Sequence, residues 1–310
     1  MNRRMSMLCL ILVAAAGMLF ATSAPAAEVD FDIANHGVWY ATGFPISSFP
    51  VFEVYCIYDV DPNELGITQM RVYGKWNYVT GEIWDGRDVY LTADGDALYT
   101  NFHGQMAHEG VPQTLTQEFV GGTGRFAGVR GTATHECHEV LASPLHGTCS
   151  CESHGTLVLA DLKSNMVPTV STEGDLLSLE LQHVEMEAFG LDPLPVLARK
   201  VTHAGEGDHV GLYSKSKFEL LDLDTMGFHG FFTQTTANGD TLDGYYEGAL
   251  SPLGGTADPL GVDMQVWITG GTGRFANASG KQAGSGLRWS DGREELTLEG
   301  AISSVGSSKK

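Results

Sequence analysis

The sequence predicts an all-β protein made of two similar units in tandem. Glycine accounts for 39 of 310 residues, and turn-forming residues recur about every 8 to 14 positions. The short runs between these turns are rich in Val, Tyr, Phe, Thr and Trp, and several alternate apolar and polar residues as half-buried antiparallel strands do. The hexapeptide GGTGRF occurs at 121–126 and again at 270–275, which indicates an internal repeat. Six to eight such strands per unit are typical of a closed barrel or a sandwich.

The first element is predicted to be a secretory signal peptide over residues 1–27. Arg3 and Arg4 precede an apolar run at 7–21, and small residues at 23–27 suit cleavage. No later apolar run approaches the roughly 18 residues of a membrane span. The remaining chain is therefore expected to be exported, to the periplasm or the medium, with no membrane attachment after cleavage.

The charge of the exported chain argues against nucleic acid as a partner. Loss of the two leader arginines from 18 Lys+Arg leaves 16 against 38 Asp+Glu, a net charge of −22. Such a chain repels nucleic acid at long range. The acidity is best interpreted as a solvated surface that keeps the protein in solution.

The first unit is expected over residues 28–165. Its predicted strands are GVWYAT, VFEVYCIYDV, ITQMRVYGKW, DVYLTA and ALYTNFHG. No amphipathic helical stretch of twelve or more residues follows the leader. The unit is therefore expected to be entirely β.

The repeated hexapeptide follows a predicted strand in both units. Its glycines suit a tight turn that needs positive φ or close backbone approach, after which the Phe returns to the core. A phosphate-binding loop would require a following Lys-Ser/Thr and a helix, and neither is present. We therefore interpret the motif as a strand–turn–strand connection. The turn residues are Gly121, Gly122, Thr123 and Gly124, and Gly270, Gly271, Thr272 and Gly273.

The segment 135–154, HECHEVLASPLHGTCSCESH, contains four His and three Cys. Zinc or copper binding is one hypothesis, although Cys-x-Cys fits no standard zinc spacing. Disulfides are the alternative expected of an exported chain. Two bridges are predicted among Cys56, Cys137, Cys149 and Cys151, with Cys56 joined to one member of the Cys-x-Cys pair and Cys137 to the other. The matching stretch of the second unit has neither residue type, so a disulfide-pinned hairpin added to the fold is favoured over a metal site.

The second unit is expected over residues 176–303. The block at 94–107 resembles that at 238–251 with an offset of 144 positions, whereas the hexapeptides are 149 apart. The five extra residues are assigned to a Gly- and Pro-containing loop at 255–261. The boundary between units is placed at 161–175, and the tail 304–310 is expected to be disordered.

The glycine turn with its flanking strands resembles a signature of the allene oxide cyclase and dirigent barrels. The resemblance rests on GGTGRFAGVRG at 121–131 and, without the Arg, on GGTGRFANASG at 270–280. It implies two tandem antiparallel eight-stranded β-barrels, each with an apolar cavity, often assembled as a homo-oligomer such as a trimer. It also implies that no cofactor is needed, because such proteins hold a reactive small molecule in one conformation while it cyclises or couples.

Three residues are candidates for catalysis. The resemblance assigns Arg130 to the cavity, where its five donors could polarise a substrate oxygen. Asp59 and Glu53 lie on one predicted strand with even spacing and can share a face. The alternatives are a rim arginine paired with a carboxylate, and exposed carboxylates in an acidic chain. The second unit has Ser279 in place of Arg130, so any active cavity is expected in the first unit.

The sequence thus predicts an exported tandem β-barrel protein that binds a small apolar molecule. It leaves open whether the protein is a cofactor-independent cyclase or isomerase, or a dirigent-like stereocontrol protein. Two alternatives are a non-catalytic secreted protein that self-associates, and a metal-binding protein acting through residues 135–154. A continuous cavity with convergent polar groups would favour binding, and a barrel filled with side chains would favour a structural role.

Overall fold

The computed structural model describes residues 27–43, 50–106, 112–143, 145–159, 166–169, 172–186, 194–207 and 211–303. Apart from Ala27, the first residue of β1, the predicted signal peptide lies outside these residues, as does the predicted tail 304–310. In the described part, regular structure is entirely strand apart from two short 3₁₀ turns. The prediction of an all-β protein is therefore confirmed.

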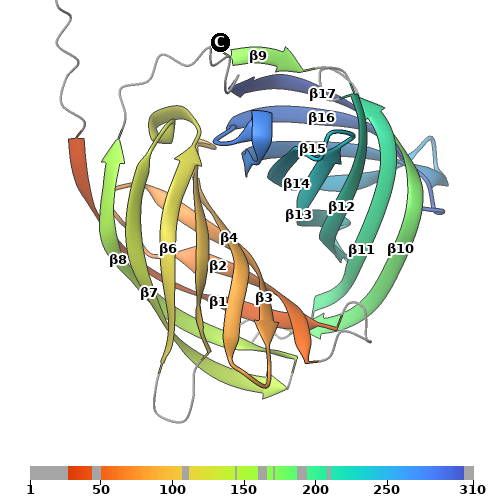
Figure 1. Ribbon diagram of the computed structural model, residues 1–310. Coiled ribbons are helices and arrows are strands. Elements are labelled where there is room, and N and C mark those ends of the chain that lie inside the picture. The colour runs from red at the N-terminus through yellow and green to blue at the C-terminus, as the bar shows by residue number, and fades with distance from the viewer. Residues whose placement is uncertain are drawn as a thin grey trace, which may run out of the picture.

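The first unit is a closed antiparallel barrel in which each strand pairs with the next and β1 pairs with β8. Figure 1 shows it as the lobe drawn in red to yellow-green. Its strands are β1 (Ala27–Thr42), β2 (Val51–Val60), β3 (Ile67–Asn77), β4 (Glu82–Thr92), β5 (Ala97–Gln105), β6 (Gln113–Gly122), β7 (Arg130–Ser143) and β8 (His146–Leu159).

The second unit is one antiparallel sheet of nine strands that curves around its own apolar core (Figure 1). Its strands are β9 (Met166–Thr169), β10 (Thr172–Met186), β11 (Leu194–Gly207), β12 (Gly211–Asp222), β13 (Gly227–Thr236), β14 (Thr241–Leu253), β15 (Thr256–Gly271), β16 (Gly280–Arg288) and β17 (Glu294–Ser303). Strand β10 pairs with β17 over three residues, and β9 pairs with the end of β17. β9 begins inside the boundary predicted at 161–175.

The segment 135–154 is not an addition to the fold, contrary to prediction. It forms most of β7 and β8, and β8 closes the barrel by pairing with β1 from Ala27 to Tyr40. The hairpin interpretation was correct, because β7 and β8 are adjacent antiparallel strands. The absence of Cys and His from the matching stretch of the second unit reflects a different interior rather than a missing element.

The two GGTGRF motifs form the same turn, ending in the 3₁₀ turns η2 (Gly124–Phe126) and η3 (Gly273–Phe275). Gly124 and Gly273 have φ of 51° and 57°, in the left-handed region that favours glycine. A Cβ on either would lie 1.8 Å from a carboxylate oxygen of Asp96 or Asp240, the matching aspartates of the repeat. The hydroxyl of Thr123 accepts a hydrogen bond from the Ala97 amide at 2.9 Å. Each motif therefore forms a strand–turn–strand connection that is hydrogen-bonded to the preceding hairpin.

The two units pack together through an apolar cluster formed by their outward faces. Tyr55 of β2 lies against Phe218 and Phe231, with ring centroids 6.1 and 5.8 Å away. The Tyr55 hydroxyl is also 2.6 Å from Nδ1 of His229. The buried members of this interface cluster are Val38, Tyr40, Tyr55, Val89, Leu91, Ala97 and Tyr99 from the barrel, and Val196, Ala198, Phe218, Leu220, Phe231, Tyr245 and Trp267 from the second sheet. Several strands are thus buried on both faces.

Candidate functional site

The interior of the first barrel contains a narrow cavity of about 30 Å³. Most of its walls are apolar. Among its polar groups, Asp88 and His135 are buried, whereas Lys75, Gln113 and Glu139 are partly exposed. The apolar walls include Trp39, Val54, Met70, Val72, Trp76, Ile83, Phe102 and Leu115.

Asp88 of β4 is the central polar group of this interior. Its Oδ2 accepts hydrogen bonds from the Thr100 hydroxyl at 2.6 Å and from the Gln117 amide at 2.7 Å. The Gln117 amide also donates to the Tyr90 hydroxyl at 2.7 Å. Oδ1 of Asp88 is buried without a hydrogen-bond partner. An unpartnered carboxyl oxygen in an apolar cavity is costly, so this atom favours a ligand that offers a donor.

Burial shifts the pKa of three cavity groups in the direction that favours the neutral form. Desolvation raises the pKa of Asp88 to about 7, although the hydrogen bonds from Thr100 and Gln117 oppose the rise. Desolvation raises the pKa of Glu139 to about 7 and lowers that of His135 to about 4. Both carboxyls therefore exchange a proton near neutral pH while the imidazole stays neutral. Shifts of this kind are common where acids and bases act on a ligand.

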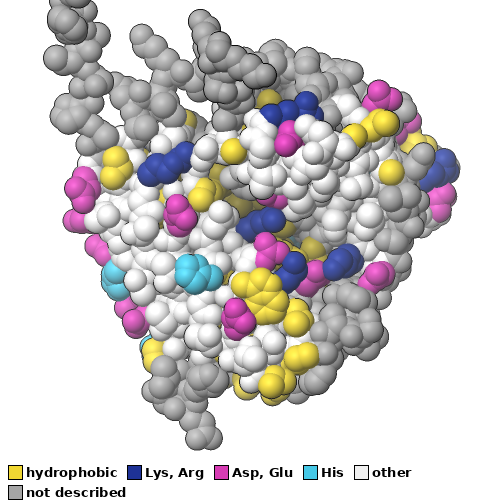
Figure 2. All heavy atoms as spheres, in the orientation of Figure 1, with side chains coloured by type: hydrophobic (Ala, Val, Ile, Leu, Met, Phe, Trp, Pro, Cys, Tyr) yellow, Lys and Arg dark blue, Asp and Glu magenta, His cyan; other side chains and the backbone are white. Residues whose placement is uncertain are grey.

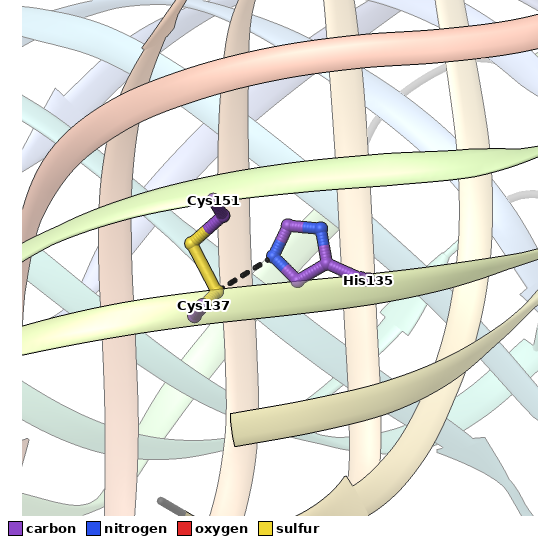
Figure 3. A group of neighbouring side chains, drawn as sticks. All are labelled: His135, Cys137 and Cys151. Atoms are coloured by element: carbon purple, nitrogen blue, oxygen red, sulfur yellow. Dashed lines mark hydrogen bonds between the residues drawn. A yellow bond between two sulfur atoms is a disulfide. The ribbon is translucent and has the colours of Figure 1, made fainter. Parts of the chain in front are cut away.

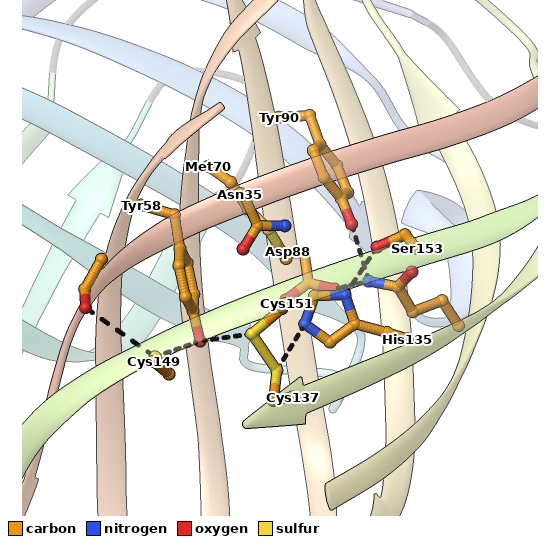
Figure 4. Close-up of a disulfide and its surroundings, with 12 residues drawn as sticks. Asn35, Tyr58, Met70, Asp88, Tyr90, His135, Cys137, Cys149, Cys151 and Ser153 are labelled. Atoms are coloured by element: carbon orange, nitrogen blue, oxygen red, sulfur yellow. Dashed lines mark hydrogen bonds between the residues drawn. A yellow bond between two sulfur atoms is a disulfide. The ribbon is translucent and has the colours of Figure 1, made fainter. Parts of the chain in front are cut away.

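A disulfide joins Cys137 of β7 to Cys151 of β8 across the hairpin, with both side chains inside the barrel. Nε2 of His135 lies 3.0 Å from Sγ of Cys137 (Figure 3). Nδ1 of His135 lies 2.5 Å from the Ser153 hydroxyl (Figure 4). This bridge confirms one of the two predicted disulfides, although the predicted pairing of Cys56 with Cys149 or Cys151 is not formed.

Cys56 and Cys149 are buried free thiols. Both β2 and β8 pair with β1, so these residues lie two strand spacings apart, or about 9 to 10 Å between strands. A disulfide needs Cα atoms within about 7 Å, which accounts for the missing second bridge. The Cys149 thiol instead donates to the Tyr58 hydroxyl at 3.2 Å. Desolvation raises the pKa of Cys149 to about 12, so it holds little reactive thiolate.

The metal hypothesis has one geometric point in its favour. Ligand atoms of His135, Cys137 and Cys151 lie within 4.8 Å of one another. The disulfide removes the two thiolates that a soft metal would need, and this is the one such group among the described residues. His138 and His154 lie on the same two strands but point outward. The arrangement therefore favours the disulfide interpretation.

The three predicted catalytic residues do not line the barrel cavity. Arg130 is exposed and belongs to the outward face of β7, where it donates to the carbonyls of Val120 and Val129 and, at 3.0 Å, to Oδ1 of Asn277. The alternative prediction, an arginine at the barrel rim, is therefore closer to the structure than a role in the cavity. That alternative expected a carboxylate partner, whereas the observed partners are carbonyl and amide oxygens. The assignment of Arg130 to the cavity is corrected because Ala133 and His135, with odd numbers, point inward on this strand.

Asp59 and Glu53 share the outward face of β2, as the even spacing predicted. Asp59 is exposed, whereas Glu53 is 5% exposed and faces the second unit. Glu53 pairs with Lys200 at 2.6 Å and accepts a hydrogen bond from the Tyr73 hydroxyl at 3.2 Å. A role for either in the barrel interior is therefore excluded.

A groove between the units contains Glu53 and further charged side chains. It has two connected hollows of about 360 and 540 Å³, both lined by Asp85, Arg87 and Thr233. Figure 2 shows charged and apolar side chains around the hollowed centre of this face. Lys75 pairs with Asp85 at 2.7 Å and Arg87 with Asp243 at 3.1 Å, so the groove's charges are largely matched within the protein.

Sequence reasoning missed Asp88, Gln117 and Glu139. In the run DVYLT at 88–92 every residue is buried, because one face of β4 points into the barrel and the other into the interface. The period-two pattern that would separate an inward carboxylate from an outward one is therefore absent. The available signal was an aspartate inside an otherwise apolar strand.

No protein-family model matches the chain, and the comparison with curated proteins returned no significant relative. Among solved structures, the chain is weakly similar to a protein from Nitrosomonas europaea described as a candidate AttH. The identity is 10%, the alignment covers 94% of this chain and 98% of that one, and the TM-score is 0.13. A similarity at this level carries no argument about fold or function. Among the described residues, no helix is long and apolar enough to cross a membrane.

Proposed function

We propose that the first barrel binds a small, largely apolar molecule that offers a hydrogen-bond donor to Asp88. The observation that carries the proposal is the unpartnered Oδ1 of Asp88 in a cavity with mostly apolar walls. A hydroxyl or amine on the ligand would satisfy this oxygen, and the apolar body would replace water against Trp39, Trp76 and Phe102.

The volume of the cavity limits the size of the ligand. A volume of about 30 Å³ holds only a few atoms unless side chains move. The proposed ligand is therefore small, or enters as Phe102 and the partly exposed groups at the open end shift. The resemblance to allene oxide cyclase and dirigent barrels suits a small apolar ligand and an exported location, and both remain predictions. With Arg130 outside the cavity, binding rather than catalysis is the activity we propose.

Ligand-detected NMR with benzyl alcohol and toluene tests the proposal. Both present the same ring, and only the alcohol donates a hydrogen bond. We expect the alcohol to bind at least several-fold more tightly, and Asp88→Asn to reduce that preference. Failure of both ligands to bind, or equal affinity for both, would contradict it.

A second pair of variants separates the cavity from the outer surface. Leu115→Trp fills the cavity, whereas Val140→Trp adds the same side chain to an outward position that is 67% exposed. We expect only Leu115→Trp to abolish binding. Circular dichroism establishes that each variant is folded before binding is measured.

A further inference from the structure

The concave face of the second sheet carries buried charges of both signs. The guanidinium of Arg288 makes two 3.0 Å hydrogen bonds to Glu219 and also pairs with Glu294 at 2.7 Å. Arg199 lies 3.3 Å from Glu219, and Lys217 pairs with Glu294 at 2.5 Å. These five groups pair with one another, as buried charges generally do, although Nε of Arg199 makes no hydrogen bond.

A neighbouring row on the same face lacks hydrogen-bond partners among the described residues. Strand register places His203 of β11 beside Lys215 of β12, and Lys215 beside Gln234 of β13. His203 is 3% exposed and neither ring nitrogen makes a hydrogen bond, although Nε2 lies 3.8 Å from an oxygen of Glu294. Gln234 is 4% exposed, and its Nε2 makes no hydrogen bond. Lys215 forms no ion pair within the described residues and lies over the ring of Phe232 at 4.2 Å. Three adjacent strands therefore present donor side chains that make no hydrogen bond within the described part of the chain.

The excess of positive charge on this face indicates that a ligand bound there is an anion. Among the described residues of this face, Arg199, Lys215, Lys217 and Arg288 face two carboxylates, Glu219 and Glu294, so cations are in excess there although the whole chain has a net charge of −20. Lys215 is partly exposed, and desolvation with the nearby Lys217 ammonium lowers its pKa to about 7, so an anionic ligand beside it would favour the charged form.

We propose that His203, Lys215 and Gln234 bind the carboxylate of a small organic acid with an apolar body. The Lys215 ammonium supplies the charge, and a His203 N–H and the Gln234 amide each donate to a carboxylate oxygen. Phe232 beside Lys215 and Leu242 beside Gln234 give the apolar part of the acid its contacts. This site is separate from the cavity of the first barrel.

Isothermal titration with hexanoate, hexanol and inorganic phosphate tests the assignment. We expect hexanoate to bind at least ten-fold more tightly than hexanol, which lacks the charge, and than phosphate, which lacks the apolar chain. Equal affinity for hexanol would overturn the carboxylate site. Tighter binding of phosphate would overturn the ligand class.

Substitutions test whether hexanoate binds at this row of the second sheet. Lys215→Met should weaken hexanoate at least ten-fold, and Gln234→Leu several-fold with no change of charge. The control Arg293→Met removes the same charge from an exposed side chain of the same unit and should leave binding unchanged. Thermal unfolding monitors folding, and Lys215→Gln, which keeps a donor, should retain part of the affinity.

Two outcomes would reject the assignment to this row. Wild-type affinity in Lys215→Met would show that the ammonium is not a ligand. Loss of hexanoate binding in Asp88→Asn would place the acid in the first barrel instead. Benzyl alcohol tests the site in the first barrel and hexanoate tests the site on the second sheet. Failure of one proposal can therefore be distinguished from failure of the other.

Discussion

Asp88 shows how one residue links the stability of the barrel to its proposed binding role. Two protein donors hold one carboxyl oxygen, and the other is left for a ligand. Desolvation exceeds the effect of these donors, so the pKa rises to about 7. A raised pKa of an acid means that the folded state holds its proton more strongly than the unfolded state.

This shift predicts how stability depends on pH. The contribution of Asp88 is fully present below the unfolded pKa of about 3.9 and is lost as pH rises toward 7. Asp88→Asn should remove that loss, so the variant should gain roughly 2 to 3 kcal/mol relative to wild type between pH 5 and pH 8. Urea unfolding across this range measures the difference. Asp59→Asn, which changes an exposed carboxyl of the same barrel, should show no comparable trend.

At the scale of elements, the repeated turn was predictable and the cysteine-bearing hairpin was only partly so. GGTGRF carries its own geometry, because Gly124 needs positive φ and leaves no room for a Cβ beside Asp96. The pairing of Cys137 with Cys151 depends instead on the register of β7 against β8, which sequence separation alone does not determine.

The geometry of this turn predicts that Gly124→Ala lowers the free energy of unfolding by more than backbone strain alone would. Gly239 also has positive φ, at 87°, but a Cβ there meets nothing within 4 Å. Gly239→Ala should therefore report strain alone, whereas Gly124→Ala adds the clash with Asp96 and should cost about 1 to 3 kcal/mol more. Thermal unfolding of the two variants measures the difference. Equal costs would mean that Asp96 moves aside freely.

The disulfide across the β7–β8 hairpin predicts how many free thiols the protein contains. Denatured, unreduced protein lacking the leader should show two free thiols, from Cys56 and Cys149, and native protein should show almost none because both are buried. Titration with a chromogenic disulfide reagent measures both values. A count of zero after denaturation would mean that Cys56 and Cys149 also form a disulfide, as predicted from sequence. A count of four would mean that no disulfide forms and would favour the metal hypothesis.

At the scale of the whole molecule, the two units are joined by a cluster of apolar side chains as well as by the chain. The internal repeat predicted two units, and the described residues form two sheets, a closed barrel and a nine-stranded sheet. It could not predict that their outward faces meet, because an apolar residue buried in an interface has the same sequence pattern as one buried in a core. Tyr55 and Phe231 illustrate this point, since each lies on a strand whose opposite face fills a unit's own interior.

The interface predicts that cutting the chain does not separate the units. A protease site introduced at 160–165 should give two fragments that elute together at the size of the intact chain. Phe231→Lys should separate them, because a charge would enter the interface cluster. Phe228→Lys is the matched control, since this side chain points into the second unit's own core and should unfold that unit instead.

The position of the disulfide has a consequence for the order of events during maturation. Cys137 and Cys151 are 1% and 2% exposed, and their sulfurs lie inside a sheet that closes only when β1 meets β8. Once that seam has formed, both sulfurs are buried and an oxidant reaches them much more slowly. Strands β7 and β8 are neighbours in the chain and pair early, whereas β1 and β8 come from opposite ends of the unit and pair late. Oxidation therefore belongs to the interval between hairpin formation and barrel closure, and a chain that closes while still reduced should keep its dithiol until it unfolds.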